Sequence, residues 1–343
     1  MKLSFAFGHP NRRSALLAVA VAAVLALLGV GLAACRSAST PAVLRVVALG
    51  DSYAAGEGLI PFDVDSVTAT TATASTGPAA VGVDAPRGDG CHRSNLAYAR
   101  VAFPHALLQH RACSGAVIAD LFAPQKTGGG AASAVNRWGA QLSNIPADTD
   151  VITLTIGGND AGFVPVLTTC ALTSDCPTAA YSGPFAQPGE TLQSYRDRRL
   201  PELRNELNAA FRRVRDAAPG AALVVVGYPQ LLPTGEVDTT VAGCSLLDAG
   251  FNAAERAWLA EAANALNDAL SKATAQAEGY FVDAAKLFEG HEACGPDGQW
   301  VSGLVLKLGS ASPIGAGSFH PNAEGQAALG SAVAATISAL RLR

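Results

Sequence analysis

Short apolar runs alternate with long amphipathic stretches over most of the chain. Four short runs bounded by turn residues predict buried β-strands: residues 44–49, 150–156, 221–226 and 280–282. Three long stretches with a helical period predict α-helices: residues 190–217, which Pro201 interrupts, 246–277 and 323–341. A further helix is expected after Ser94, whose hydroxyl could cap it. This alternation predicts an α/β protein with a mostly parallel sheet.

Two stretches without a clear period are expected to be loops. Residues 63–90 are rich in Thr, Ala, Gly and Asp and predict a long surface loop, either a lid or an idle insertion. Residues 170–189 are expected to form a rim loop. Sites in parallel sheets gather at the carboxyl ends of strands, so motifs just after strands are the first candidates for chemistry.

The first 35 residues have the pattern of an export signal. A positively charged start precedes residues 15–34, which are uncharged and almost wholly apolar, and Cys35 follows. This ending resembles the lipobox of bacterial lipoproteins, in which the cysteine is lipidated and becomes the new N-terminus. We therefore expect a signal peptide at residues 1–34, a lipidated Cys35 with a tether at 35–43, and one folded domain at 44–343.

A plain secretory signal and a transmembrane anchor are the alternatives, since about 20 apolar residues can span a bilayer. The twin arginine Arg12-Arg13 leaves both Sec and Tat export open. Cleavage before Cys35 would remove Lys2, Arg12 and Arg13 but no acid, so the net charge of −4 would become three units more negative. That charge opposes attraction to anionic membranes, so only the lipid on Cys35 would anchor the chain.

Composition narrows the class further. The chain has 343 residues, of which 49% are hydrophobic and 15% charged, so it can form a sizeable core. Its 24 basic and 28 acidic residues form no basic run, and no nucleic-acid partner is expected. The predicted helices have ordinary amphipathic faces for covering a sheet, so we expect a monomer.

Seven cysteines are present, and six remain when Cys35 is set aside. An even number in an exported chain indicates disulfides, and six cysteines allow 15 pairings. Sequential pairing is the simplest of these: Cys91–Cys113, Cys170–Cys176 and Cys244–Cys294. A zinc site is the competing interpretation, but no Cys-x-x-Cys or His-x3-His cluster accompanies these residues.

Ser52 is the candidate nucleophile. It follows the first predicted strand in Gly50-Asp51-Ser52-Tyr53, where its hydroxyl could be exposed at the edge of the sheet. A serine becomes nucleophilic only if a base takes its proton, and the candidate base is His320, in a loop before the last helix. The fold, not the sequence, brings such partners together, so their wide separation is no objection.

Acyl transfer also needs hydrogen-bond donors for the developing oxyanion. The backbone N–H groups of Ser52 and Gly115 are two candidates, and the side chain of Asn159, in a Gly-Gly-Asn-Asp turn after a strand, is the third. Asp51 and Asp160 are expected to stabilise turns, because Asp side chains bond nearby backbone N–H groups.

These motifs together resemble the SGNH/GDSL hydrolases, and most of all the secreted actinobacterial lipases and esterases. The matching segments are GDSY at 50–53, ACSGA at 112–116, GGND at 157–160 and HPN at 320–322. The resemblance implies a flavodoxin-like three-layer α/β/α domain that hydrolyses carboxylic esters through an acyl-serine intermediate. It also implies the sequential disulfide pairing, and neither a metal nor an organic cofactor.

One position departs from the family pattern. Many relatives have an acid three residues before the histidine, where this chain has Gly317. Some actinobacterial members use a backbone carbonyl there instead, so we expect the Gly317 carbonyl to orient His320 by accepting its Nδ1–H. Asp283, at the end of a predicted strand, is the alternative triad acid. His92 could line the site, while His105, His110 and His291 are expected to be surface, packing or structural residues.

Three functions fit these residues. The first is an extracytoplasmic esterase or lipase, either lipid-anchored or secreted, whose partner is an ester substrate. The second is an esterase for acylated cell-wall or dietary polysaccharides, which the same groups could serve. The third is a surface-binding lipoprotein without catalysis, which would have no need for the nucleophile, base and oxyanion donors together.

Overall fold

The computed structural model describes residues 43–63, 90–125, 139–237, 239–240, 244–305, 315 and 317–340. All of them belong to one compact unit, Val43–Leu342. The expected signal peptide, Cys35 and nearly all of the expected loop at 63–90 lie outside the described residues.

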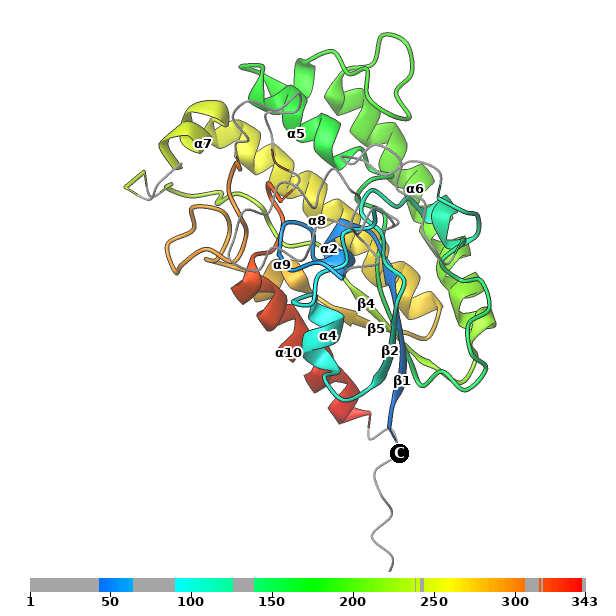
Figure 1. Ribbon diagram of the computed structural model, residues 1–343. Coiled ribbons are helices and arrows are strands. Elements are labelled where there is room, and N and C mark those ends of the chain that lie inside the picture. Colours follow the sequence, from blue (N-terminus) through cyan, green and yellow to red (C-terminus); the bar gives the residue numbers. More distant parts are fainter. Residues whose placement is uncertain are drawn as a thin grey trace, which may run out of the picture. The chain divides into compact units, whose positions relative to one another are not determined.

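A single five-stranded parallel sheet forms the centre of this unit (Figure 1). Its strands are β1 (Arg45–Gly50), β2 (Leu107–His110), β3 (Val151–Thr155), β4 (Ala222–Val226) and β5 (Tyr280–Val282). The order across the sheet is β2-β1-β3-β4-β5, and every neighbouring pair is parallel. This is the flavodoxin-like order, in which the strand order reverses next to the first strand and ligands bind at the carboxyl edge.

Helices cover both faces of the sheet. Alternate residues of a strand point to opposite faces, so Val46 and Ala48 belong to one core and Val47 and Leu49 to the other. The first core packs against α4 (Tyr98–Ala102) and α10 (Ala323–Ala339), which lie side by side. The second packs against α6 (Leu192–Ala217) and α8 (Ala253–Gln276). The predicted three-layer α/β/α fold is confirmed.

The remaining helices are short and lie in the connections. They are α2 (Ser52–Ala55), α5 (Phe163–Ala171), α7 (Cys244–Gly250) and α9 (Ala284–Leu287), with 3-10 turns at Ile118–Leu121 and Cys176–Thr178. Among the described helices, none is long and apolar enough to span a bilayer.

Two helix predictions need correction. The stretch 246–277 forms two helices, because the Asn252 side chain accepts hydrogen bonds from the N–H groups of Ala254 and Glu255 and starts α8 afresh. The expected interruption at Pro201 is absent, since α6 continues through it. Proline removes one helical hydrogen bond, and the carbonyl left free belongs to the exposed Asp197.

The strand β2 was not predicted, and the prediction that Ser94 caps the helix after it is wrong. β2 is a half-exposed edge strand that contains Gln109 and His110, so it has no continuous apolar run. The Ser94 hydroxyl accepts from Leu96 N–H and forms a turn, and α4 begins only at Tyr98.

The structure contains the three disulfides of the sequential pairing. Each of them links two segments outside the strands of the sheet. Cys91–Cys113 links the segment before α4 to the segment after β2. Cys170–Cys176 holds the end of α5 to a 3-10 turn, and Cys244–Cys294 links α7 to the loop after α9.

Candidate active site

Ser52 lies at the turn where β1 passes into α2. Gly50 ends the strand with φ of +130°, and a Cβ there would overlap the Thr155 carbonyl oxygen, so glycine is required. Asp51 caps the helix, because its Oδ1 accepts from the Tyr53 N–H at 3.0 Å. The turn places Ser52 at the first helical position, on the carboxyl edge of the sheet.

The Asp51 carboxylate joins three strand ends. Its Oδ2 accepts from the Tyr228 hydroxyl at 2.5 Å, and that hydroxyl accepts from the Gly158 N–H at 2.8 Å. These residues follow β1, β4 and β3 respectively. Burial raises the pKa of Asp51 to about 7, although the hydrogen bonds from Tyr228 and Tyr53 oppose that rise. Asp51 therefore has the turn-stabilising position that we expected.

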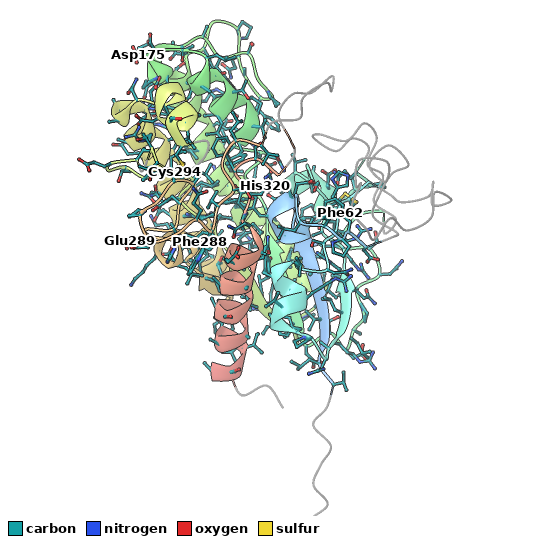
Figure 2. The ribbon with its side chains drawn as sticks, turned by 60° about the vertical axis from the view of Figure 1, so that its left-hand side comes forward. Phe62, Asp175, Phe288, Glu289, Cys294 and His320 are labelled. Carbon is teal, nitrogen blue, oxygen red and sulfur yellow. A yellow bond between two sulfur atoms is a disulfide. The ribbon has the colours of Figure 1, made fainter. Side chains whose placement is uncertain are left out.

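His320 comes from the loop before α10 (Figure 2), and its side chain reaches Ser52. Its Nε2 lies 2.7 Å from the Ser52 Oγ, and its Nδ1 lies 2.9 Å from the Ser318 carbonyl oxygen. A carbonyl oxygen only accepts, so Nδ1 carries the proton and Nε2 is free to accept from the serine hydroxyl. The structure thus brings together two residues that are 268 positions apart.

The expectation that Gly317 orients the histidine is wrong. Its carbonyl accepts from the backbone N–H of His320 at 3.2 Å, which closes a tight turn and directs it away from the ring. Phe319, inside that turn, has φ of +58°, and the carbonyl at the imidazole is that of Ser318. The principle of a backbone carbonyl in place of an acid holds, but the residue differs.

Packing fixes the imidazole ring on its face as well as at its edge. The Tyr53 ring lies with its centroid 4.7 Å from that of His320, and the Tyr53 hydroxyl donates to the Phe319 carbonyl at 2.6 Å. Burial lowers the pKa of His320 below the ordinary 6.5, while the charge of Glu57 and the bond to Ser318 oppose that effect. The ring is therefore neutral at pH 7 and can act as a base.

The three groups that we expected to donate to an oxyanion each keep a hydrogen that is not bonded within the described residues. Among the described residues, none accepts from the backbone N–H of Ser52 or of Gly115. The Asn159 Nδ2 donates to the Ala116 carbonyl at 2.9 Å, and this bond uses one of its two hydrogens. Gly115 has φ of +80°, a conformation that favours glycine.

Asp160 connects two of the segments that carry these donors. Both of its carboxylate oxygens accept from the Ile118 N–H, at 3.0 and 3.2 Å. Burial raises the pKa of Asp160 to about 7, against the lowering effects of the Ile118 bond and of Arg199. Asp160 therefore stabilises turns, as expected.

Four polar residues near the site were given no role from the sequence. Tyr228 supports Asp51, and the Gln141 side chain bonds both the N–H and the carbonyl of Gly50, at 2.7 and 2.9 Å. The Gln326 side chain links α10 to the Tyr53 carbonyl at 3.0 Å. Glu57, the fourth, is a buried carboxylate one turn after Ser52. Only the folded chain brings their partners within reach.

The other candidates lie elsewhere or have other partners. Asp283 caps α9 through a bond from the Lys286 N–H at 3.1 Å, so it is not the acid of a triad. The buried His110 bonds the Ala54 carbonyl through Nε2 at 3.0 Å, and His291 stacks on Trp300. His92 is buried against Glu57. No group of residues that could hold a metal ion is present in the described parts of the chain.

An apolar cavity of about 110 Å³ lies between α5, α6, α8 and the loop after β4. Gly158 and Tyr228 line the end that adjoins the nucleophile turn, and Phe163, which packs edge-on against Tyr53 at 5.9 Å, continues its wall. Leu266 on α8 and Leu167 on α5 also line it. The cavity is lined mainly by hydrocarbon.

The site consists of a serine hydrogen-bonded to a histidine at the carboxyl edge of a parallel sheet. This arrangement is typical of serine hydrolases with an α/β fold. Comparison with known proteins places the chain within that class. The chain belongs to the GDSL-like lipase/acylhydrolase family, whose model matches residues 48–328. It is a lipase or esterase of this family.

Several Streptomyces enzymes are similar over most of their length. A lipase of Streptomyces rimosus is 28% identical over 92% of this chain and 94% of its own, and Lipase 1 of Streptomyces coelicolor is 29% identical over 86% and 87%. Among solved structures, phospholipase A1 from Streptomyces albidoflavus matches 86% of this chain and 99% of its own, with 28% identity and a TM-score of 0.59. An extracellular lipase of Streptomyces rimosus has 25% identity over 86% of this chain and 99% of its own, with a TM-score of 0.56.

Proposed function

We propose that the protein hydrolyses carboxylic esters through an acyl-serine intermediate, with Ser52 as nucleophile and His320 as base. The observation that carries the proposal is the chain of contacts from Ser52 Oγ to His320 Nε2, and from His320 Nδ1 to the Ser318 carbonyl. It has the order of nucleophile, base and orienting group that nucleophilic catalysis requires.

The reaction would proceed in two balanced steps. Ser52 Oγ attacks the ester carbonyl carbon while its proton passes to His320 Nε2, and the oxyanion is bound by Ser52 N–H, Gly115 N–H and the Asn159 amide. Collapse breaks the bond to the alcohol, which leaves with the proton from His320. Water then attacks the acyl-serine, gives a proton to His320 and releases the acid, and Ser52 recovers its proton.

The protein would work without a triad carboxylate at Nδ1. The Ser318 carbonyl holds the correct tautomer, because it can only accept from Nδ1–H. Its neutral dipole stabilises a developing imidazolium less than a full negative charge would.

The cavity favours acyl chains longer than acetyl and so favours a lipase or general esterase over a deacetylase. Its lining is mainly aliphatic and aromatic, and it adjoins the turn of Asn159. Ala263 lines the cavity, so Ala263→Leu should reduce kcat/KM on a palmitate ester more than on an acetate ester. Ala254→Leu, on the exposed side of the same helix, is the matched control.

For location, we propose export through the signal at residues 1–34, with a lipid on Cys35 as the anchor, the tether at 35–43 and the hydrolase domain at 44–343. Three disulfides support an oxidising compartment, and one relative is described as extracellular. Labelling of the full-length chain with an alkyne fatty acid tests the anchor. Cys35→Ser should abolish the label, and a label that persists would contradict it.

The catalytic assignment is tested with the protein from Arg36 onward on p-nitrophenyl esters from acetate to palmitate. Ser52→Ala and His320→Ala should each lower kcat/KM by about 10³-fold or more, with unchanged circular dichroism. Activity that survives Ser52→Ala would overturn the acyl-serine mechanism. An optimum at acetate would favour the polysaccharide esterase instead.

A further inference from the structure

We propose that Glu57 is a positioning residue of this site: it anchors the turn that carries the Gly115 oxyanion donor and supplies a fixed negative charge to His320. The inference rests on the proposed function, because it assigns a role beside the Ser52–His320 pair.

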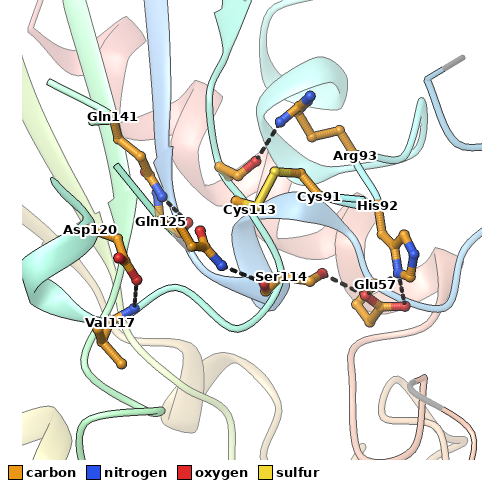
Figure 3. Close-up of a disulfide and its surroundings, with 12 residues drawn as sticks. Glu57, Cys91, His92, Arg93, Cys113, Ser114, Val117, Asp120, Gln125 and Gln141 are labelled. Carbon is orange, nitrogen blue, oxygen red and sulfur yellow. Dashed lines mark hydrogen bonds and ion pairs between the residues drawn. A yellow bond between two sulfur atoms is a disulfide. The ribbon is translucent and has the colours of Figure 1, made fainter. Parts of the chain in front are cut away.

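Glu57 is a buried carboxylate without a lysine or arginine partner among the described residues. It is 5% exposed. Its Oε2 lies 2.8 Å from His92 Nδ1 and accepts from the Ser114 hydroxyl at 2.5 Å, and its Oε1 lies 3.1 Å from His92 Nδ1 (Figure 3). Burial of a carboxylate is unfavourable unless strong donors face it. A neutral amide could bridge His92 and Ser114 without that penalty, so a purely structural bridge would not need a charged side chain.

The backbone places Glu57 between the nucleophile and the loop of the base. The C-cap of α2 is Gly56, with φ of +80°, and the Glu57 N–H that follows donates to the Ser52 carbonyl at 3.0 Å. The next residue, Gly58, touches the histidine loop so closely that a Cβ on it would lie 2.6 Å from the Gly317 Cα. The backbone around Glu57 therefore contacts both the helix of Ser52 and the loop of His320.

The side chain of Glu57 also holds the oxyanion turn. Ser114 is bound at three atoms: its hydroxyl donates to Glu57, its N–H donates to the Cys91 carbonyl at 3.1 Å, and its carbonyl accepts from Gln125 at 3.0 Å. Gly115 follows directly, so the direction of its N–H depends on this fixation. Loss of the Glu57 bond removes the side-chain anchor of the donor.

Charge is the second part of the role. Burial alone would raise the pKa of Glu57, but the bonds from His92 and Ser114 and the attraction of His92 and His320 outweigh it and keep the pKa below its ordinary value. Among the described residues, the charged or polar groups that act on His320 are Glu57, the Ser318 carbonyl and the Ser52 hydroxyl, with the Tyr53 ring against its face. The Glu57 charge therefore favours the imidazolium that forms when Ser52 gives up its proton.

Three substitutions separate the anchor from the charge. Glu57→Gln removes the charge and can keep both bonds, since His92 can present an unprotonated Nδ1 to the amide. Ser114→Ala removes the anchor and keeps the charge. Glu255→Gln is the control, because Glu255 is equally buried but is not among the charges that act on His320.

The readout is the pH profile of kcat and kcat/KM on a p-nitrophenyl ester. Glu57→Gln should lower kcat by about tenfold, which corresponds to about one pKa unit of lost stabilisation, with little change in KM, and should move the acid limb to lower pH. Ser114→Ala should lower kcat and leave that limb in place. The profile of Glu255→Gln should match the wild type.

If the wild type is active and Glu57→Gln changes neither kcat nor the acid limb, the inference about Glu57 is wrong. Loss of activity in Ser52→Ala and His320→Ala would then show that the proposed mechanism still stands. If Glu57→Gln unfolds, Glu57→Asp replaces it. Glu57→Asp keeps the charge, so it should keep the position of the acid limb and lower kcat. A shift of its acid limb to lower pH would contradict the role of charge.

Discussion

Two buried carboxylates flank the short helix of the nucleophile, and their surroundings are opposite. Asp51, before the helix, faces a tyrosine hydroxyl and backbone N–H groups, and burial raises its pKa to about 7. Glu57, after the helix, faces a histidine and a serine, and its pKa is lowered. Equal burial therefore does not decide the charge of a carboxylate; the donors around it do. Asp51, at the N-terminal end of α2, stabilises the turn, which we call the rigid end. Glu57, after the C-terminal end, can remain ionised, and we call this the charged end.

The largest effect is expected from removal of the carboxylate at the rigid end. Asp51→Ala should lower the free energy of unfolding by about 2–4 kcal/mol, because it removes the helix cap and leaves the buried Tyr228 hydroxyl without its acceptor. Urea denaturation measures the loss. In a double-mutant cycle, Tyr228→Phe should be strongly coupled to Asp51→Ala, and additive effects would show that the two side chains act separately.

A smaller effect is expected where the charged end meets the histidine loop. Gly58 has φ of +86° and touches Gly317, so Gly58→Ala should cost about 1–3 kcal/mol of stability and should also displace His320 and lower kcat. Gly189→Ala is the control, since Gly189 has φ of +79° but open space around it. Equal effects of the two substitutions on kcat would mean that the contact with Gly317 is unimportant.

The smallest effect is a difference in how stability depends on pH. The folded protein keeps a proton on Asp51 up to about pH 7, whereas the unfolded chain releases it near 3.8. This contribution is complete below pH 3.8 and is lost as the pH rises through 7, so the stability advantage of wild type over Asp51→Asn should shrink between pH 4 and 7.

Glu57 should show the opposite sign. Its contribution is present above the ordinary pKa of 4.5 and is lost only as the pH falls below that value. Glu57 also raises the pKa of His320, so the comparison is made in the His320→Ala background. There the stability difference that Glu57→Gln causes should stay constant from pH 5 to 8. Urea midpoints measured across that range test the predictions for Asp51→Asn and for Glu57→Gln. The contrast would be wrong if the stability differences of both variants changed with pH in the same way.

Sequence reasoning could propose the parts of the candidate site that depend on local pattern. Ser52, Gly115 and Asn159 stand in short turns with recognisable residues, and the structure brings Ser52 to His320. It could not find Tyr228 or Glu57, because their partners lie 177, 57 and 35 residues away, at separations where only the fold decides.

The mistaken carbonyl shows a second limit. Gly317 and Ser318 are adjacent, and which of the two faces the imidazole depends on the positive φ of Phe319. No side-chain pattern encodes that rotation, since a carbonyl is present at every residue. The same applies to β2, an edge strand that is defined by its neighbour β1 and not by its own apolar residues.

The bond between Cys91 and Cys113 closes a covalent ring with β2 and α4 inside it. Each cysteine is followed directly by a donor to Glu57, His92 in one case and Ser114 in the other. Oxidation of two thiols thus sets the spacing of both donors in a single event. Whether this one bond has formed therefore decides how firmly the surroundings of Gly115, the proposed oxyanion donor, are held in a freshly folded chain.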